Sequence, residues 1–160
     1  MARVALIGSG RMGLFHGETL SRRLPGVRLV AVADPVPGAA ERLGAGREYA
    51  DPDPVWADPE VDAVVIAAPA RFHADLAVAA ARAGKHVFCE KPMALSSADA
   101  DRVIDAAREA GVVLQVGFNR RFAPDWVAAR ALIDDARAAL AIALTAADSA
   151  RTGRVVEVAK

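Results

Sequence analysis

The sequence predicts an α/β fold: a doubly wound parallel sheet with helices on both faces, in a single domain with a long C-terminal helix. Two observations predict the sheet. Short apolar runs, often β-branched, alternate regularly with helical segments, and each run is almost continuously apolar, as in strands buried on both faces. A third observation predicts the long helix, because residues 125–152 contain neither Gly nor Pro and are rich in Ala, Leu, Ile and Arg.

The apolar runs place the strands. We expect them at residues 4–7, 29–33, 63–67, 86–89 and 112–116, with a weaker strand at 48–50. Strand–helix–strand units of this length close into a parallel sheet with right-handed crossovers.

Helices are expected between these strands, at residues 12–23, 37–43, 71–83 and 97–110. Glycines directly after the last three, at 44, 84 and 111, are typical of helix ends that need a left-handed residue. Ser96 and Ser97, followed by Asp99, supply a capping oxygen and charge suited to a helix start. Residues 51–59, rich in Asp and Pro, predict a loop around one short turn.

The last quarter predicts either one helix over 124–152 or two helices that meet near Asp134 and Asp135, with Gly153 ending the segment. Residues 155–158 predict a short strand or an extended tail. We therefore expect a nucleotide-binding domain at residues 1–135, and a C-terminal helix and tail at 136–160 that packs back on it.

Composition narrows the possible partners. The 160 residues carry 20 basic and 20 acidic side chains, and this balance argues against nucleic-acid or membrane-surface binding. A single cysteine, Cys89, excludes an internal disulfide and fits a cytoplasmic protein. Its apolar neighbours favour a buried, inert thiol over a reactive one. The start of the chain does not resemble a signal peptide, and no two histidines have metal-ligand spacing, so we expect no metal.

A glycine-rich turn follows the first expected strand and opens the first helix: Gly8, Ser9, Gly10, Arg11, Met12 and Gly13. In this pattern Gly8 permits the tight turn, Gly10 lets a pyrophosphate approach the backbone, and Gly13 lets helix and strand pack closely. The helix start then offers unpaired N–H groups to the phosphates. A generic strand-to-helix turn is the alternative.

Asp34 follows the second expected strand at the position where an acidic residue binds the adenosine ribose. Its carboxylate would repel a 2′-phosphate, and the following Pro35 and Val36 offer no arginine to bind one. These residues predict NAD as the cofactor in preference to NADP. The alternative is a surface aspartate before a turn proline.

Other candidate residues also follow apolar runs. Because ligands bind beyond the carboxyl ends of parallel strands, they should share one edge of the sheet. The residues concerned are Ala68, Pro69, His73, Glu90, Lys91 and Asn119.

Lys91 could hold or move a proton beside a nicotinamide ring, and Glu90 could bind the nicotinamide ribose or pair with Lys91. The Lys91–Pro92 bond is a candidate for the cis form. A solvated Glu–Lys pair is the alternative. For His73 the alternative is a structural, backbone-bonding histidine, and Arg120 and Arg121 could either reach a phosphate or form a solvated basic turn.

Four segments in order carry a family resemblance: ALIGSGRMG at 5–13, AD at 33–34, AGKHVFCEKP at 83–92 and GFNRRF at 117–122. Together they resemble the Gfo/Idh/MocA oxidoreductases, and are most similar to the inositol 2-dehydrogenase branch of that family. The resemblance implies NAD(P)-dependent oxidation of a sugar or cyclitol hydroxyl, with Lys91 as a catalytic residue.

The resemblance also implies a second domain that supplies the substrate pocket and an Asp–His pair, for which this chain has no room. All three histidines precede Cys89. Residues 138–158 resemble the extreme C-terminus of the same enzymes, so we expect a first domain joined near Asp135 to a terminal helix. This arrangement predicts NAD(H) binding with little or no turnover, and a weak homodimer through the C-terminal helix or an exposed domain interface. A non-catalytic dinucleotide-binding or redox-sensing module is the alternative, and a SAM- or FAD-binding domain a weaker one.

Overall fold

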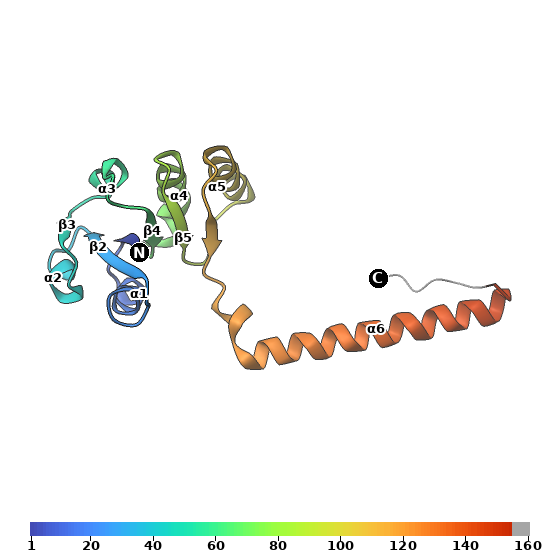
Figure 1. Cartoon of the computed structure of the whole chain (residues 1–160). Helices are drawn as coiled ribbons and strands as arrows, with labels where there is room; N and C mark the ends of the chain where they lie inside the picture. The colour runs from blue at the N-terminus through green and yellow to red at the C-terminus, as the bar shows by residue number, and fades with distance from the viewer. Residues whose placement is uncertain (155–160) are drawn as a thin grey trace. The chain divides into compact units, whose positions relative to one another are not determined.

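The computed structural model describes residues 1–154 and contains a six-stranded parallel sheet with helices on both faces (Figure 1). The strands are β1 (Ala2–Ile7), β2 (Val27–Ala33), β3 (Arg47–Tyr49), β4 (Ala63–Ile66), β5 (His86–Cys89) and β6 (Leu114–Val116). Their order is β3-β2-β1-β4-β5-β6, and every neighbouring pair is parallel. The α/β doubly wound sheet expected from the sequence is confirmed.

The helices and 3₁₀ helices connect these strands. They are α1 (Arg11–Arg22), α2 (Ala39–Leu43), α3 (Asp53–Ala57), η1 (Ala70–Phe72), α4 (His73–Arg82), α5 (Ser97–Ala110), η2 (Asn119–Phe122) and α6 (Pro124–Thr152). Helix α5 begins as expected: the Ser96 hydroxyl accepts a hydrogen bond of 3.1 Å from the Asp99 N–H. It ends at Gly111, whose φ of +66° lies in the left-handed region.

Two apolar layers cover the sheet because successive side chains of a strand point to opposite faces. Along β1, Ile7 packs in the layer that contains α4 and α5, whereas Leu6 packs in the layer that contains α1 and α2. Both side chains are almost completely buried. Figure 1 shows the two helix layers above and below the sheet. Because all neighbouring strands are parallel, their carboxyl ends lie at one edge of this sheet.

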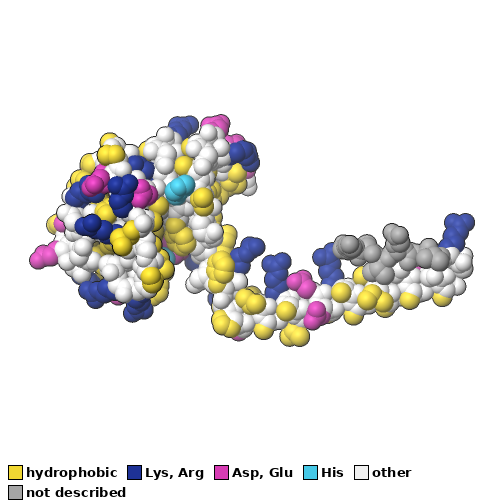
Figure 2. Space-filling model, in the orientation of Figure 1, with side chains coloured by type: hydrophobic (Ala, Val, Ile, Leu, Met, Phe, Trp, Pro, Cys, Tyr) yellow, Lys and Arg dark blue, Asp and Glu magenta, His cyan; other side chains and the backbone are white. Residues whose placement is uncertain are grey.

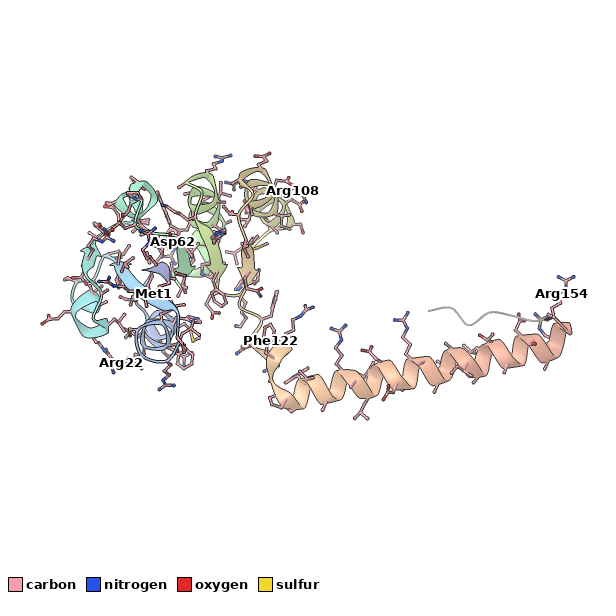
Figure 3. All side chains as sticks on the ribbon, viewed as in Figure 1. Met1, Arg22, Asp62, Arg108, Phe122 and Arg154 are labelled. Carbon is pink, nitrogen blue, oxygen red and sulfur yellow. The ribbon has the colours of Figure 1, made fainter. Side chains whose placement is uncertain are left out.

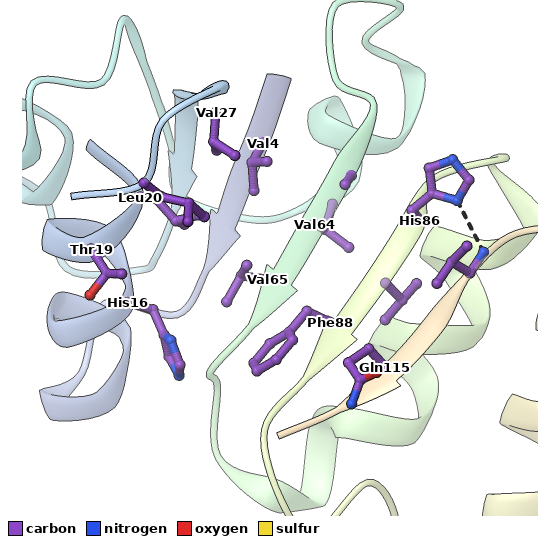
Figure 4. A pocket seen from close by; sticks show the side chains of 14 residues that line it. Val4, His16, Thr19, Leu20, Val27, Val64, Val65, His86, Phe88 and Gln115 are labelled. Carbon is purple, nitrogen blue, oxygen red and sulfur yellow. Dashed lines mark hydrogen bonds between the residues drawn. The ribbon is translucent and has the colours of Figure 1, made fainter. Parts of the chain in front are cut away.

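Helices α1 and α2 leave part of their face of the sheet uncovered. An apolar groove of about 360 Å³ lies there, between α1 and strands β4 to β6 (Figure 4). Val65 of β4 and Phe88 of β5 form part of its floor, and His16 and Leu20 of α1 form one side. This groove is distinct from the carboxyl edge of β1 and β2.

The chain divides into two units, Met1–Gly117 and Phe118–Lys160. Helix α6 in the second unit is one continuous helix, so of the two arrangements expected for this segment the single helix is observed. The expected domain boundary at residue 135 falls inside α6, whereas the structure divides the chain after Gly117. The packing of the C-terminal segment on the domain stays a prediction, and the tail expected at 155–158 lies outside the described residues.

Apolar side chains are exposed along α6, as the yellow side chains in Figure 2 show. Leu132, Ile133, Leu140, Ile142 and Leu144 each have more than half of their surface exposed. No helix in residues 1–154 is long and apolar enough to cross a membrane.

Candidate functional site

The glycine turn between β1 and α1 has the geometry that its sequence requires. Gly8 has a φ of +89°, a left-handed conformation that side chains disfavour, and a Cβ there would lie 2.7 Å from the Ala68 backbone. A Cβ on Gly13 would lie 2.0 Å from the Gly8 carbonyl oxygen. Around Gly10, in contrast, nothing apart from its chain neighbours lies within 4 Å of the Cβ position. The chain itself therefore requires glycine at 8 and 13 but not at 10.

The start of α1 presents unpaired N–H groups at this turn. Its N-cap residue is Gly10, no side chain of residues 1–154 caps it, and its first turn holds no acidic residue. Helix α5 differs, since the Ser96 hydroxyl caps it. An uncapped helix start combines free N–H donors with the positive end of the helix dipole, which suits a phosphate.

The Asp34 carboxylate, at the end of β2, is tied to the same turn. One oxygen accepts a hydrogen bond of 2.6 Å from the Ser9 N–H, and the other accepts one of 2.8 Å from the Val36 N–H. Burial on its own raises the pKa of Asp34, but these backbone hydrogen bonds outweigh it and hold the pKa below its usual value. The group is therefore a fixed negative charge beside the glycine turn.

A cleft of about 980 Å³ opens between these elements at the carboxyl edge of the sheet. Eight of the residues singled out from the sequence line it: Gly8, Gly10, Arg11, Met12, Asp34, Pro35, Ala68 and Pro69. They come from the ends of β1, β2 and β4, where the order of strands reverses around β1. Ligands of open parallel sheets bind at such a reversal.

Sequence reasoning missed one wall of this cleft. Trp56 of α3, together with Phe72 and Leu76 beyond β4, gives it an apolar side. Residues 51–53 also line the cleft, although the sequence placed them only in a loop. Their position after the weak strand β3, which neighbours β2, was the signal that could have identified them.

Glu90, Lys91 and Pro92 form a turn at the end of β5, and the Lys91–Pro92 bond is cis. The side chain of Glu90 is not paired with the Lys91 ammonium. One of its oxygens lies 2.7 Å from His16 Nε2, and the other accepts the Lys91 N–H at 3.1 Å. The side chain of Glu90 is only 15% exposed, so the alternative of a solvated Glu–Lys pair does not describe it. Lys91 itself is exposed.

His73 was expected at the cofactor, and the structure instead buries it. Its ring nitrogens lie 2.7 Å from the carbonyl oxygens of Pro92 and Ala68, and only 2% of the residue is exposed. Both nitrogens are thus occupied by backbone, which matches the structural alternative. The ring links the segments that follow β4 and β5.

Three further expectations concern Asn119, Cys89 and metal binding. Asn119 lies in the second unit, where its side-chain oxygen accepts the Arg120 N–H, and its role at the cofactor stays a prediction. Cys89 is fully buried, and burial, followed by the charge of Glu90, raises the pKa of its thiol to about 12. It is therefore an unreactive thiol. Within residues 1–154 no cluster of three His, Cys, Asp or Glu side chains could hold a metal ion.

A parallel sheet of this order, a glycine turn before an uncapped helix and a carboxylate at the end of the second strand define a dinucleotide-binding domain of the Rossmann type. Comparison with known proteins gives the family. A family model described as an oxidoreductase family with an NAD-binding Rossmann fold matches residues 2–118. The chain belongs to this family, the Gfo/Idh/MocA oxidoreductases, and contains its NAD-binding domain, as the resemblance implied.

Individual relatives and solved structures that are similar to the chain support the same family. The chain is 41% identical over 136 residues to a scyllo-inositol 2-dehydrogenase (NAD(+)) of Bacillus subtilis, covering 82% of this chain and 40% of the relative. It is 45% identical over 140 residues to an inositol 2-dehydrogenase of Rhizobium meliloti, covering 84% and 41%. A crystal structure of scyllo-inositol dehydrogenase from Lactobacillus casei with bound NAD(H) and scyllo-inositol superposes with a TM-score of 0.79 at 30% identity, covering 86% and 42%. The chain thus spans about two fifths of the length of these relatives.

Proposed function

We propose that this chain binds NAD(H) in the cleft at the carboxyl edge of its sheet, prefers NAD to NADP, and is the nucleotide domain of an inositol dehydrogenase-like oxidoreductase. The observation that carries the proposal is the Asp34 carboxylate, held by the Ser9 and Val36 N–H groups at the mouth of the glycine turn. From there it can accept hydrogen bonds from both ribose hydroxyls, whereas a 2′-phosphate would meet its negative charge.

The pyrophosphate, the adenosine and the nicotinamide of the cofactor would each lie against a different region of the site. The pyrophosphate would lie over Gly10, Arg11 and Met12 at the uncapped start of α1. The adenosine would extend past Asp34 and Pro35 toward the apolar wall at Trp56. The nicotinamide would lie toward Ala68, Pro69 and the Glu90–Pro92 turn, whose β5 strand directly neighbours β4.

Calorimetric titration with NADH and NADPH tests the proposal. We expect wild type to bind NADH more tightly than NADPH, and Asp34→Ala to lose about tenfold or more in NADH affinity, as for a hydrogen bond to a charged group. Asp105→Asn removes an exposed carboxylate of α5 that pairs with Arg108 and should leave both affinities unchanged. Equal affinities for NADH and NADPH in wild type would contradict the assigned specificity.

Lys91 is the proposed catalytic residue, since its exposed ammonium follows Glu90 at the strand end beside the expected nicotinamide position. NAD, when bound, would accept a hydride from the alcohol carbon, and Lys91 would hold or move the hydroxyl proton. Positioning of substrate contributes a large share of such catalysis. Because the chain covers about two fifths of its relatives, we expect no more than trace turnover of inositol with NAD by the isolated chain. Ordinary rates in an NADH absorbance assay would refute this expectation.

Two further proposals concern the setting of the protein. We propose that it forms a weak homodimer, because the exposed apolar side chains of α6 favour association. We also propose a cytoplasmic location, which fits a lone cysteine that is buried as a free thiol.

A further inference from the structure

His16 is a partly buried contact of the Glu90 carboxylate that the proposed function does not use. It lies on α1, three residues beyond Gly13, so one helical turn places it on the side of α1 that faces the sheet. Its Nε2 lies 2.7 Å from Glu90 Oε1, and the His16 and Glu90 side chains are only 19% and 15% exposed. A carboxylate can only accept, so Nε2 is the donor in this hydrogen bond.

The ring of His16 is fixed on two further sides. Phe88 of β5 meets it edge-on with ring centroids 5.4 Å apart, and Phe15 does so at 5.9 Å. Figure 4 shows His16 and Phe88 reaching from α1 and β5 toward the same end of the apolar groove. The ring therefore approaches Glu90 from a rigid helix and in one orientation.

Gly117, directly after β6, leaves the space that the Phe88 ring and the Glu90 carboxylate occupy. A Cβ on Gly117 would lie 3.1 Å from Phe88 Cζ and 3.3 Å from Glu90 Oε1, closer than side chains normally pack. The second Glu90 oxygen accepts the Lys91 N–H at 3.1 Å. The carboxylate thus joins α1 to the backbone of the residue that carries the proposed catalytic ammonium.

We propose that His16 is a positioning residue for the nicotinamide half of the cofactor. By donating to Glu90 it fixes the carboxylate, and through the Lys91 N–H it fixes the start of the Glu90–Pro92 turn. This inference rests on the proposed NAD(H) site. It assigns α1 two tasks, since its first residues would meet the pyrophosphate while His16, one turn further, holds the turn at the end of β5.

The test separates the two halves of the dinucleotide by using NADH and ADP as probes, because ADP lacks the nicotinamide riboside. For His16→Ala we expect NADH affinity to fall about tenfold, as for loss of a hydrogen bond to a charged group, and ADP affinity to stay within about twofold. Thr19→Ala is the matched control: it removes an exposed hydroxyl from the next turn of α1, bonded only to the Phe15 carbonyl, and should change neither affinity.

Rescue and coupling distinguish positioning from a general effect on folding. His16→Gln restores a donor and should recover most of the NADH affinity, whereas His16→Leu, which fills the space without a donor, should not. Glu90→Ala, which removes the acceptor, should make a subsequent His16→Leu change nearly silent, because both act through one contact. Thermal unfolding of each variant identifies any that lose the fold. If His16→Ala is among them, the comparison of His16→Gln with His16→Leu tests the inference in its place.

Equal losses of NADH and ADP affinity in His16→Leu, or no loss of either, would overturn the inference and leave the proposed function standing. Fully additive losses from His16→Leu and Glu90→Ala would overturn it as well. A folded wild-type chain that binds neither nucleotide would refute the proposed function itself, and the inference with it.

Discussion

At the scale of single residues, two glycines of one turn have different tasks. Gly13 has no room for a side chain, because its Cβ would lie 2.0 Å from a backbone oxygen, whereas the space around Gly10 is open. No contact within the described residues therefore requires glycine at position 10. In the glycine-rich motif, a glycine at this second position lets the pyrophosphate of a ligand approach the backbone.

This contrast predicts opposite behaviour for two alanine substitutions. Gly13→Ala should lower the free energy of unfolding by about 1–3 kcal/mol or more, as overpacking against backbone does. Gly10→Ala should leave stability within about 0.5 kcal/mol of wild type and yet weaken NADH binding. Urea unfolding and calorimetry measure the two effects. A stable Gly13→Ala, or a Gly10→Ala that binds NADH normally, would contradict the division of tasks.

Asp62, which lies just before β4 (labelled in Figure 3), pairs with Arg3 of β1 at the opposite edge of the sheet from the cleft. Its oxygens accept hydrogen bonds from the Arg3 guanidinium at 2.6 and 3.1 Å and from the Arg3 N–H at 2.8 Å. These bonds, the guanidinium's first, hold the pKa of Asp62 well below its ordinary value of 3.8.

Because this pKa is lowered by folding, the pair stabilises the fold above about pH 4 and loses that contribution as the pH falls toward the folded-state pKa. Asp62→Asn should therefore be less stable than wild type near neutral pH, and the difference should narrow as the pH falls from about 5 to about 2. Urea unfolding at a series of pH values measures it. A difference independent of pH would show that the charge of Asp62 is not what matters.

The sequence predicted that Gly8, Asp34 and Ala68 share one edge, because each follows an apolar strand, and all three line the cleft there, while their contact with a cofactor stays a prediction. Sequence reasoning failed at His73, where chain position near the edge suggested ligand contact, but the ring points into the protein and bonds to backbone. It also did not single out His16 as a candidate residue. The contact between His16 and Glu90 joins residues that are 74 positions apart in the chain. A local sequence pattern cannot predict such a long-range contact.

At the scale of elements, the apolar runs predicted all six strands, the segments between them predicted α1, α2, α4 and α5, and composition predicted α6; most differences lie at the ends of these elements. Helix α2 begins at Ala39 rather than 37, because Gly38 has a φ of +99° that no right-handed helix accommodates. The helix expected from residue 71 divides into η1 and α4, since its first turn is 3₁₀. The short helix α3 formed where a loop with one turn was expected.

Helix α5 offers a direct test of capping. Ser96→Ala removes the oxygen that accepts the Asp99 N–H, and we expect it to lower the free energy of unfolding by about 1 kcal/mol. Ser97→Ala, one residue later and inside the helix, is the control and should have a much smaller effect. Thermal or urea unfolding of both variants measures the difference. Equal effects would mean that the cap does not stabilise α5.

At the scale of the whole molecule, the fold class was predictable because buried parallel strands have an almost unmistakable apolar pattern. The extent of the first unit was not, since helix propensity runs unbroken through residue 135 and marks no boundary there. The apolar wall of the cleft was also not predicted. Trp56 of α3 lies at the cleft because β3, the strand before α3, pairs with β2, and this pairing could not be read from the local sequence.

The exposed apolar side chains of α6 predict self-association that depends on them. Leu140→Gln with Leu144→Gln should shift the protein toward monomer, because each replacement removes an exposed apolar group. Arg137→Gln, on the same helix, should leave the mass unchanged. Light scattering over a range of protein concentrations measures the molar mass and hence the oligomeric state. A wild-type chain that stays monomeric at high concentration would contradict the proposed dimer.

The most direct measurement of the central claim is a crystal structure of the chain with NADH. We expect the pyrophosphate against the N–H groups at the start of α1, with Gly10 beneath it, and the adenosine ribose hydroxyls on the Asp34 carboxylate. A cofactor bound elsewhere, or a cleft that stays empty at saturating NADH, would contradict the account.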